Sequence, residues 1–329
     1  MKILVFGPTD RYQVYKPDYV ADLPLETVFR RPDQSYIQAA QENQDAEILF
    51  VDAITNIGAD IMDALPHLKM IHSEGVGYNC IDCAAARERG IYVCNNQGCN
   101  ADSVAEHTIM LMLMALRHGI TGHNAVREGR QFQMKQIVMA SRAPELGLST
   151  VGIVGLGDIG QATARRLAPF GCKLYYYSLH RRSQQLEEEL GITYLPLDEL
   201  VQVCDILSLH AAVNDQTRGM INAELIAKMR PGLVLVNTAR GDLLDNLAVR
   251  QALIDGQIGA IAMDTIAPEP TPADHPLVAL PPEVQVRAVY SPHLGGNTGG
   301  AFSRAHANMW HNAHLLLEGQ RLERIVNGL

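Results

Sequence analysis

Short apolar runs bounded by Gly, Pro or Asn recur along residues 1–100. They cover residues 3–6, 48–51, 70–72 and 91–94, and amphipathic stretches such as residues 82–88 lie between them. Apolar runs of this length with such boundaries are typical of buried strands, and the spacers have helical periodicity. The pattern predicts alternating β and α elements that build a parallel sheet.

A second series of the same kind begins at residue 151. Six strands with helices between them make a doubly wound unit of the size that binds a dinucleotide. A further strand at residues 286–290 follows a proline-rich stretch, and the final helix, at about residues 297–318, is expected to pack on the first unit. The six apolar runs lie at residues 151–154, 173–177, 192–195, 205–209, 233–237 and 258–263.

One helix is predicted between the two series, from residue 100 to residue 116. Ser103 and Glu106 have the spacing of a capping box. Residues 109–116 are apolar on every side of such a helix. The second half of this helix should therefore be covered on more than one face.

The composition is that of a globular protein with about two domains. The chain has 329 residues, of which 47% are hydrophobic and 19% are charged. Its net charge of -9 disfavours a nucleic acid as partner. The longest apolar run is too short to span a bilayer, and the N-terminus lacks the pattern of a signal peptide. We therefore expect a cytoplasmic protein, without membrane contact, whose six cysteines are reduced.

Isolated cysteines, histidines and the single tryptophan carry little functional signal. Cys80 and Cys83 have the spacing of a metal-binding knuckle, but no second Cys or His pair follows at a zinc-site interval, so no metal is expected. Trp310 is expected to pack in the core. Four histidines on predicted helices are expected at the surface or at an interface. These are His107, His306, His311 and His314.

A Gly-x-Gly-x-x-Gly sequence joins the strand at residues 151–154 to the helix that follows. Its glycines are Gly155, Gly157 and Gly160. At this junction Gly155 can make the tight turn, Gly157 lets a pyrophosphate approach the backbone, and Gly160 permits close packing of helix on strand. The context favours a dinucleotide phosphate site over a plain glycine turn.

The end of the next strand bears on the choice between NAD and NADP. An acidic residue about 20 positions after the glycines binds the ribose 2′-hydroxyl in NAD-binding units. By our alignment Ser178 occupies that position, and His180, Arg181 and Arg182 follow. A hydroxyl and guanidinium groups suit a 2′-phosphate, with Arg181 as the main contact and Arg182 or His180 beside it. The alternative is that the two arginines are a solvated start of a helix.

An arginine, a carboxylate and a histidine each follow the end of a predicted strand. These are Arg240, Glu269 and His293. Open α/β sheets bind ligands at that edge, where the three would supply a clamp for a substrate carboxylate, an orienting base and a proton donor. Taken singly, they could be a surface ion pair, a loop carboxylate and a structural histidine. Together they favour an active site.

Several motifs in this order resemble the D-isomer-specific 2-hydroxyacid dehydrogenase family, which includes glyoxylate/hydroxypyruvate reductases and phosphoglycerate dehydrogenases. The resemblance runs from about residue 71 to residue 319, and implies a Rossmann-type doubly wound domain inserted into a smaller flavodoxin-like α/β substrate domain. The implied substrate domain is residues 1–100 plus 291–329, and the dinucleotide-binding domain is residues 101–290. A homodimer is also implied. The motifs are residues 74–79, 100–107, 155–160, 237–241 and 292–296.

The resemblance also implies a role for individual residues. Arg240 would bind the carboxylate and carbonyl of a keto acid, His293 would donate the proton, and Glu269 would keep His293 protonated. Backbone amides of Val76 and Gly77 would complete the carboxylate site, and Asp264 would contact the nicotinamide side of the cofactor. The implied cofactor-binding residues are Gly155, Gly157, Asp158, Ile159, Gly160, Ser178, His180, Arg181, Arg182, His210, Ala211, Thr217, Thr238, Ala239, Asp264, Gly295 and Gly296.

The sequence thus predicts an enzyme that reduces a small 2-keto acid, such as glyoxylate or hydroxypyruvate, to the D-2-hydroxy acid with NADPH preferred over NADH. Phosphoglycerate dehydrogenases carry arginine where Asp52 stands, so we expect a substrate without phosphate. The alternative is a dinucleotide-sensing binding protein, because corepressors resembling this family exist. Those carry extra tails for partners, which we do not expect here, so the enzyme is favoured. Which 2-keto acid is reduced stays open.

Overall fold

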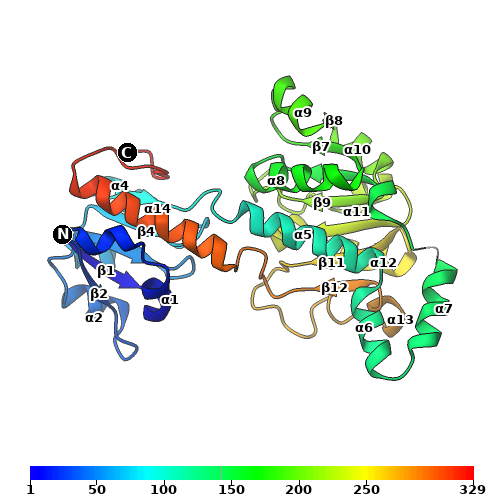
Figure 1. The fold of residues 1–329 in the computed structure, drawn as a ribbon, viewed down its shortest axis with the longest axis horizontal. Helices are drawn as coiled ribbons and strands as arrows, with labels where there is room; N and C mark the ends of the chain where they lie inside the picture. Colours follow the sequence, from blue (N-terminus) through cyan, green and yellow to red (C-terminus); the bar gives the residue numbers. More distant parts are fainter. Residues whose placement is uncertain (142) are drawn as a thin grey trace. The chain divides into compact units, whose positions relative to one another are not determined.

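The computed structural model describes residues 1–141 and 143–329, which divide into two compact units (Figure 1). Unit 1 comprises Met1–Asn100 and Asn297–Leu329, and unit 2 comprises Ala101–Gly296. Residues 291–296, which we assigned to the substrate domain, belong to unit 2. The reason is local: the amides of Leu294 and Gly295 donate to the carboxylate of Asp264 within unit 2, at 2.9 Å each.

Unit 1 contains a parallel sheet in the strand order β2-β1-β3-β4-β5. The chain goes from β1 to β2 on one side and then crosses to β3 on the other side, so a switch point lies between β1 and β3. This is the flavodoxin-like order that the family resemblance implies. The strands are β1 (Lys2–Phe6), β2 (Glu26–Phe29), β3 (Ile48–Val51), β4 (Met70–Ser73) and β5 (Tyr92–Cys94).

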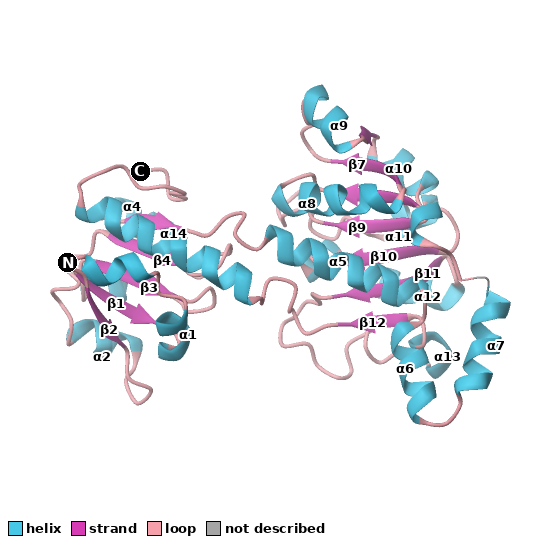
Figure 2. Ribbon diagram, in the orientation of Figure 1, coloured by secondary structure: helices cyan, strands magenta, loops and turns pink. Residues whose placement is uncertain are grey.

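Both faces of this sheet are covered by helices (Figure 2). Leu4 and Phe6 of β1 pack in a cluster with residues of α2, α3 and α4, while Ile3 and Val5 pack with residues of α1 and α14. Trp310 of α14 is buried against Phe50, so the prediction that it packs in the core is confirmed. The elements are α1 (Thr9–Val14), η1 (Asp18–Asp22), α2 (Tyr36–Gln41), α3 (Ala59–Asp63), α4 (Cys83–Glu88) and α14 (Gly299–Leu317).

Unit 2 contains a seven-stranded parallel sheet in the order β12-β11-β10-β9-β6-β7-β8. The strand order reverses between β6 and β9, which is the doubly wound arrangement predicted from the second series. The strands are β6 (Thr150–Val154), β7 (Lys173–Tyr177), β8 (Ile192–Tyr194), β9 (Ile206–Leu209), β10 (Leu233–Asn237), β11 (Ile258–Met263) and β12 (Ala288–Tyr290).

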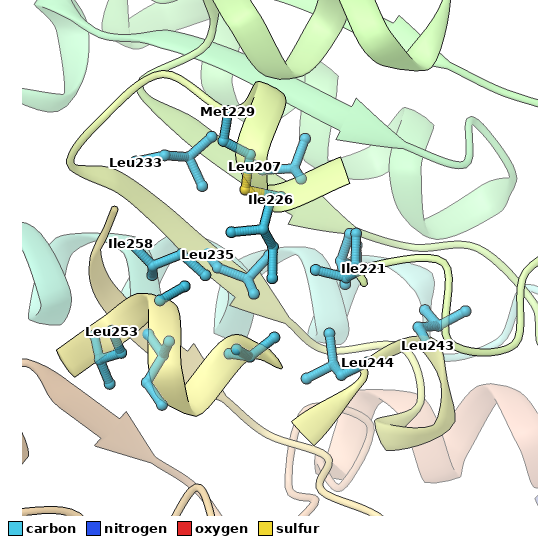
Figure 3. Packing of buried hydrophobic residues seen from close by; sticks show 14 of the residues in the cluster. Leu207, Ile221, Ile226, Met229, Leu233, Leu235, Leu243, Leu244, Leu253 and Ile258 are labelled. Carbon is cyan, nitrogen blue, oxygen red and sulfur yellow. The ribbon is translucent and has the colours of Figure 1, made fainter. Parts of the chain in front are cut away.

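Helices cover both faces of the second sheet as well. Residues of α5, α8 and α9 pack on one face, and residues of α10, α11 and α12 pack on the other. Figure 3 shows the cluster on the face that α10, α11 and α12 cover, in which Ile226 of α11 and Leu253 of α12 lie near Leu235 of β10. The elements are α5 (Ala101–Leu116), α6 (Gly119–Arg127), α7 (Gln131–Ser141), η2 (Leu146–Leu148), α8 (Asp158–Leu167), η3 (Ala168–Phe170), α9 (Gln184–Leu190), α10 (Leu197–Val203), α11 (Ala223–Lys228), η4 (Gly241–Leu243), α12 (Asn246–Asp255) and α13 (Pro282–Gln285).

Helix α5 differs from its prediction at the start and agrees with it further along. The helix begins at Ala101, so Ser103 lies inside the first turn and the predicted capping box is wrong. Leu111, Met112 and Leu116 are buried in a cluster with residues of β6, β10 and α8, so the apolar half is covered mainly by unit 2 itself. Within the described residues, no helix is long and apolar enough to cross a membrane.

Candidate active site

The glycine loop between β6 and α8 leaves open space at the start of the helix. Gly155 has a φ of +94°, and a Cβ there would lie 2.7 Å from the amide nitrogen of Ala211. A Cβ on Gly160 would lie 2.1 Å from the carbonyl oxygen of Gly155, whereas a Cβ on Gly157 would meet no atom within 4 Å. The helix start therefore has room for a group next to its amides, as a dinucleotide pyrophosphate requires.

The end of β9 lies on the other side of the switch point. The His210 amide donates to the carbonyl oxygen of Val154 at 2.7 Å, which ties β9 to β6. The residue is partly buried, with Nδ1 shielded from solvent and Nε2 at 2.9 Å from Ser208 Oγ, and desolvation lowers the pKa of His210 to about 4. Thr217 Oγ1 donates to the carbonyl oxygen of Ala212 at 2.7 Å and closes the turn after the strand. These side chains shape the loop beside the glycines.

The loop after β7 places Ser178 and Arg182 on the glycine loop. Both contact Leu156, which lies between Gly155 and Gly157: the Leu156 amide donates to Ser178 Oγ at 2.8 Å, and Arg182 Nε donates to the Leu156 carbonyl oxygen at 3.0 Å. Among the described residues, none accepts a hydrogen bond from the Nη atoms of Arg182. This guanidinium therefore keeps donors for a ligand at the glycine loop.

Arg181, which we expected to be the main contact of a 2′-phosphate, is held by Glu187. Arg181 Nε and Nη2 donate to the two oxygens of Glu187 at 2.9 and 2.8 Å, and its guanidinium lies over the ring of Tyr194. Hydrogen bonds from Arg181 and from the Tyr176 hydroxyl lower the pKa of Glu187 to about 2. Arg181 is thus already neutralised by a carboxylate, whereas the neighbouring His180 is exposed.

A pocket of about 660 Å³ at the carboxyl edge of the sheet is lined by Arg240, Glu269 and His293, so the structure brings the three predicted side chains together. Nδ1 of His293 lies 2.8 Å from Oε2 of Glu269, and both side chains are about half exposed. His293 has a φ of +54°. The remaining lining residues are Arg218, Gly219, Gly241, Asp242, Leu244, Asn246, Ala267 and Pro268.

The turn that carries Arg240 is held by hydrogen bonds from the end of β10. Asn237 Nδ2 donates to the carbonyl oxygen of Arg240 at 3.0 Å, and Asn237 Oδ1 accepts from the Ala239 amide at 3.0 Å. Thr238 Oγ1 lies 2.9 Å from Oγ1 of Thr108 on α5. The backbone at Arg240 is therefore fixed before a substrate arrives.

Asp264 holds the loop that carries His293. Its carboxylate accepts from Ser291 Oγ at 2.5 Å and from the amides of Leu294 and Gly295, and its carbonyl oxygen accepts from the His293 amide at 2.9 Å. Burial by itself would raise the pKa of Asp264, but hydrogen bonds from His107, Ser291 and the two amides outweigh it and keep that pKa well below its usual range. We expected a nicotinamide contact at Asp264, and in the structure this carboxylate binds protein groups.

Two histidines that we expected at the surface or at an interface have structural partners instead. His107 Nε2 lies 2.8 Å from Ser291 Oγ and 3.2 Å from Oδ1 of Asp264, so α5 supports the His293 loop. His306 is fully buried and its Nε2 lies 2.8 Å from Oε1 of Glu74. The sequence carried no signal for either contact, because each pair lies far apart in the chain.

In unit 1, Val76 and Gly77 lie on the loop after β4. Their carbonyl oxygens accept from Asn95 Nδ2 and from Ser73 Oγ, each at 2.8 Å. Neither amide of Val76 and Gly77 has an acceptor among the described residues. We call these two donors the amide pair, and they can bind an anionic oxygen. No group of side chains that could hold a metal ion occurs in the described part of either unit.

Comparison with known proteins adds family evidence to this geometry. Residues 109–295, more than half of the chain, match the family model described as D-isomer specific 2-hydroxyacid dehydrogenase, NAD binding domain. A glyoxylate reductase of Thermofilum pendens is 35% identical over 86% of this chain and 82% of its own length. A hydroxypyruvate reductase of Thermotoga maritima is 36% identical over 79% of this chain and 81% of its own length.

Other relatives are longer. The D-3-phosphoglycerate dehydrogenase of Mycobacterium tuberculosis is 35% identical over 90% of this chain, but the match spans only 53% of that protein. Among solved structures, a glyoxylate reductase from Paecilomyes thermophila is 26% identical with a TM-score of 0.80, and the match covers 99% of this chain and 98% of that one. The glycine loop, the doubly wound sheet and these matches agree, and the chain belongs to the D-isomer-specific 2-hydroxyacid dehydrogenase family, whose domain here binds a nicotinamide dinucleotide.

Proposed function

We propose that this protein reduces a small 2-keto acid, such as glyoxylate or hydroxypyruvate, to the D-2-hydroxy acid. The observation that carries the proposal is the 2.8 Å contact between His293 Nδ1 and Glu269 Oε2 in the pocket that Arg240 also lines. A histidine held by a carboxylate can exist as a proton donor near neutral pH, and an arginine can bind a carboxylate through two parallel hydrogen bonds.

Each of these side chains has one task in the proposed reaction. The bound nicotinamide supplies the hydride. Arg240 binds the carboxylate and the carbonyl of the keto acid, and His293 gives a proton to the carbonyl oxygen as negative charge develops there. Glu269 orients the ring through its contact with Nδ1. In unit 1, the amide pair of Val76 and Gly77 donates to the substrate carboxylate.

The cofactor that we propose is NADPH in preference to NADH. Ser178 stands where a carboxylate would bind the 2′-hydroxyl of NAD and repel a 2′-phosphate. Arg182 presents its Nη atoms from the same loop, while Arg181 is bound by Glu187. We therefore assign the 2′-phosphate contact to Arg182 and Ser178, although the sequence pointed first to Arg181.

The proposed substrate carries no phosphate. Oδ1 of Asp52 accepts from the amides of Ile54 and Thr55 and from Thr55 Oγ1, so this carboxylate organises the turn after β3. A phosphorylated substrate that approached this turn would meet a fixed negative charge, which is costly unless it is paired. The relatives named as phosphoglycerate dehydrogenases therefore do not define the substrate of this chain.

A panel of 2-keto acids tests the proposal directly. The purified protein is mixed with NADPH or NADH and with glyoxylate, hydroxypyruvate or 3-phosphohydroxypyruvate, and consumption of the reduced cofactor is followed. Fast turnover of glyoxylate or hydroxypyruvate supports the enzyme. Tight binding of NADPH without turnover of any keto acid supports the alternative, a dinucleotide-sensing protein. A higher kcat/KM for 3-phosphohydroxypyruvate would refute the argument from Asp52.

A further inference from the structure

A buried carboxylate lies two residues before the amide pair of unit 1. The side chain of Glu74 is only 5% exposed. Its oxygens accept from Nε of Arg11 at 2.8 Å, from Nη2 of the same arginine, and from Nε2 of His306 at 2.8 Å. Arg11 belongs to α1 and His306 to α14, so one carboxylate joins two helices to the end of β4.

Aromatic rings enclose this charged cluster. The Arg11 guanidinium lies 5.0 Å from the ring centre of Phe302, and the Tyr12 ring packs edge-on at 4.7 Å from the His306 ring. Since Nδ1 of His306 is buried with no partner among the described residues, the proton on Nε2 is fixed by the acceptor Glu74. The low local dielectric strengthens the interactions of Glu74 and His306, whose side chains are 5% and 0% exposed, while the Arg11 side chain is 28% exposed.

Stability alone is a weak reason for such a cluster. Desolvation of two or three charged groups offsets much of their attraction, and apolar residues of similar volume often stabilise a core as well or better. What the cluster does supply is a fixed geometry at the end of β4.

The backbone around Glu74 is also anchored. The Glu74 amide donates to the Val51 carbonyl oxygen at 2.7 Å, and the Glu74 carbonyl oxygen accepts from Asn96 Nδ2 at 3.0 Å. The next carbonyl oxygen, of Gly75, accepts from the Asn96 amide at 3.0 Å. With the carbonyls of Val76 and Gly77 bound as described above, each carbonyl in this stretch bonds back into unit 1. The amides of the pair are the donors that are left for a ligand.

We propose that Glu74 is a positioning residue for the amide pair, and that Arg11 and His306 hold it in place. This inference rests on the proposed function, in which the pair binds the carboxylate of the keto acid. The Glu74 side chain supplies the third anchor, beside the two backbone bonds, that stops the loop from rotating. Donors that are already oriented do not lose binding energy to reorganisation when the anion arrives.

Replacement of Glu74 tests the proposal. Glu74→Ala should raise KM for glyoxylate by about tenfold or more while kcat changes less, because lost orientation of a binding group weakens substrate binding first. Glu74→Gln, which keeps the size and one acceptor, should give an intermediate KM. Arg11→Ala should also raise KM for glyoxylate. The double variant Arg11→Ala/Glu74→Ala should have the same KM as Glu74→Ala alone, because both changes remove the same anchor. The dissociation constant of NADPH should stay unchanged, because the proposed cofactor residues lie in unit 2.

Asn312→Ala is the matched control. Asn312 is also buried on α14, where it bonds both backbone groups of Glu323 and contacts no residue of the cluster. The substitution Asn312→Ala should lower the free energy of unfolding and leave KM for glyoxylate unchanged. If Glu74→Ala loses stability like Asn312→Ala but keeps the wild-type KM, Glu74 is only structural and the proposal is wrong.

Binding of a substrate analogue distinguishes a failure of this proposal from a failure of the proposed function. Oxamate, an amide analogue of a 2-keto acid that is not reduced, is titrated into the protein with NADPH, and its dissociation constant is measured by calorimetry. If the wild type binds oxamate but reduces no keto acid, the proposed reduction fails, and the ratio of oxamate affinities still tests Glu74. An equal oxamate affinity in wild type and Glu74→Ala, or no oxamate binding at all, overturns the inference.

Discussion

Arg181 and Glu187 form a two-point ion pair at the loop after β7, with N–O distances of 2.9 and 2.8 Å. The Tyr176 hydroxyl donates to the same carboxylate at 2.7 Å and accepts from the Arg182 amide at 2.9 Å. The pair therefore fixes the backbone from which Arg182 reaches Leu156. Two adjacent arginines have different surroundings: one has a buried anion as partner, and the other has its Nη atoms available.

The first prediction is that Arg182, rather than Arg181, carries the preference for NADPH. A charge-assisted hydrogen bond to phosphate contributes about 1.5 to 3 kcal/mol, so Arg182→Ala should lower kcat/KM for NADPH by roughly 10 to 150-fold and change that for NADH little. Arg181→Ala should have a smaller effect, and Ser178→Asp should reverse the preference. The measurement is kcat/KM with both cofactors. Equal efficiency with NADH in the wild type would show that neither arginine selects the cofactor.

A second prediction concerns the proton donor. His293→Ala should lower kcat by about 10² to 10⁴-fold and leave the affinity for NADPH nearly unchanged, since a positioned general acid contributes that factor. Glu269→Gln keeps the size of the side chain but removes the carboxylate that holds Nδ1 of His293, so it should lower kcat by about tenfold or more. The exposed His311 serves as control, and His311→Ala should behave as wild type. Wild-type turnover in His293→Ala would contradict the mechanism.

Much of this fold follows from local pattern. The buried strands β3, β10 and β11 have the bounds that their apolar runs predict, because each is covered on both faces, and the partly buried β7 has its predicted bounds as well. The edge strand β2 was missed, since it is short and partly exposed and contains Glu26 and Thr27. Short runs with polar residues do not distinguish an edge strand from a loop.

The sequence predicted the site residues that follow the ends of strands. It did not predict the hydrogen-bond and ion-pair partners that other segments of the chain supply. Arg240, Glu269 and His293 were found because parallel strands end at one edge of a sheet. Glu187 was not found as the partner of Arg181, because a glutamate on a surface helix resembles any solvated residue. The ion pair between Arg181 and Glu187 depends on how α9 packs, which the sequence pattern does not specify.

The third prediction is that Asp264 acts on His293 through the loop. Asp264→Asn replaces one acceptor by a donor that faces an amide, so it should lower kcat about tenfold or more and lower the free energy of unfolding by about 1 to 3 kcal/mol. Because the folded pKa of Asp264 is depressed, its stabilisation is complete above its unfolded pKa of about 3.9 and is lost only as pH falls below that value. Titration of Asp264 should therefore not affect how kcat of the wild type depends on pH between about pH 5 and pH 9. Asp245→Asn, at the N-cap of α12, is the control and should keep kcat.

Stability should depend on the protonation of His72 in unit 1. Burial lowers the pKa of His72 from 6.5 to about 4, so the unfolded chain binds a proton before the folded unit does. The stabilisation is present above about pH 6.5 and decreases as pH falls toward 4. Between about pH 7 and pH 5 the free energy of unfolding of unit 1 should fall by about 2 kcal/mol because of this histidine.

The fluorescence of Trp310, the single tryptophan, reports the unfolding of unit 1 in urea titrations at both pH values. His72→Gln should flatten the dependence, and His311→Gln should not. An unchanged slope in His72→Gln would contradict the assignment.

The last prediction is that the protein forms a homodimer through α6 and α7 of unit 2. The apolar half of α5, which the sequence predicts to be covered on more than one face, is mostly covered within unit 2 and so leaves little apolar surface for a partner. The exposed apolar side chains lie on the two following helices: Phe132 and Met139 of α7 are 73% and 71% exposed, and Val126 of α6 is also exposed. Phe132 and Met139 are seven residues apart on α7 and therefore share one face of that helix. Burial of this face against a second copy would remove large apolar side chains from water, which favours association. The double variant Phe132→Lys/Met139→Lys should convert a dimer at micromolar concentration to a monomer, as measured by sedimentation equilibrium. Leu247→Lys, which changes a similarly exposed leucine on α12, should leave the dimer intact. A monomeric wild type at that concentration would refute the prediction, and a dimer that survives the double variant would place the interface elsewhere.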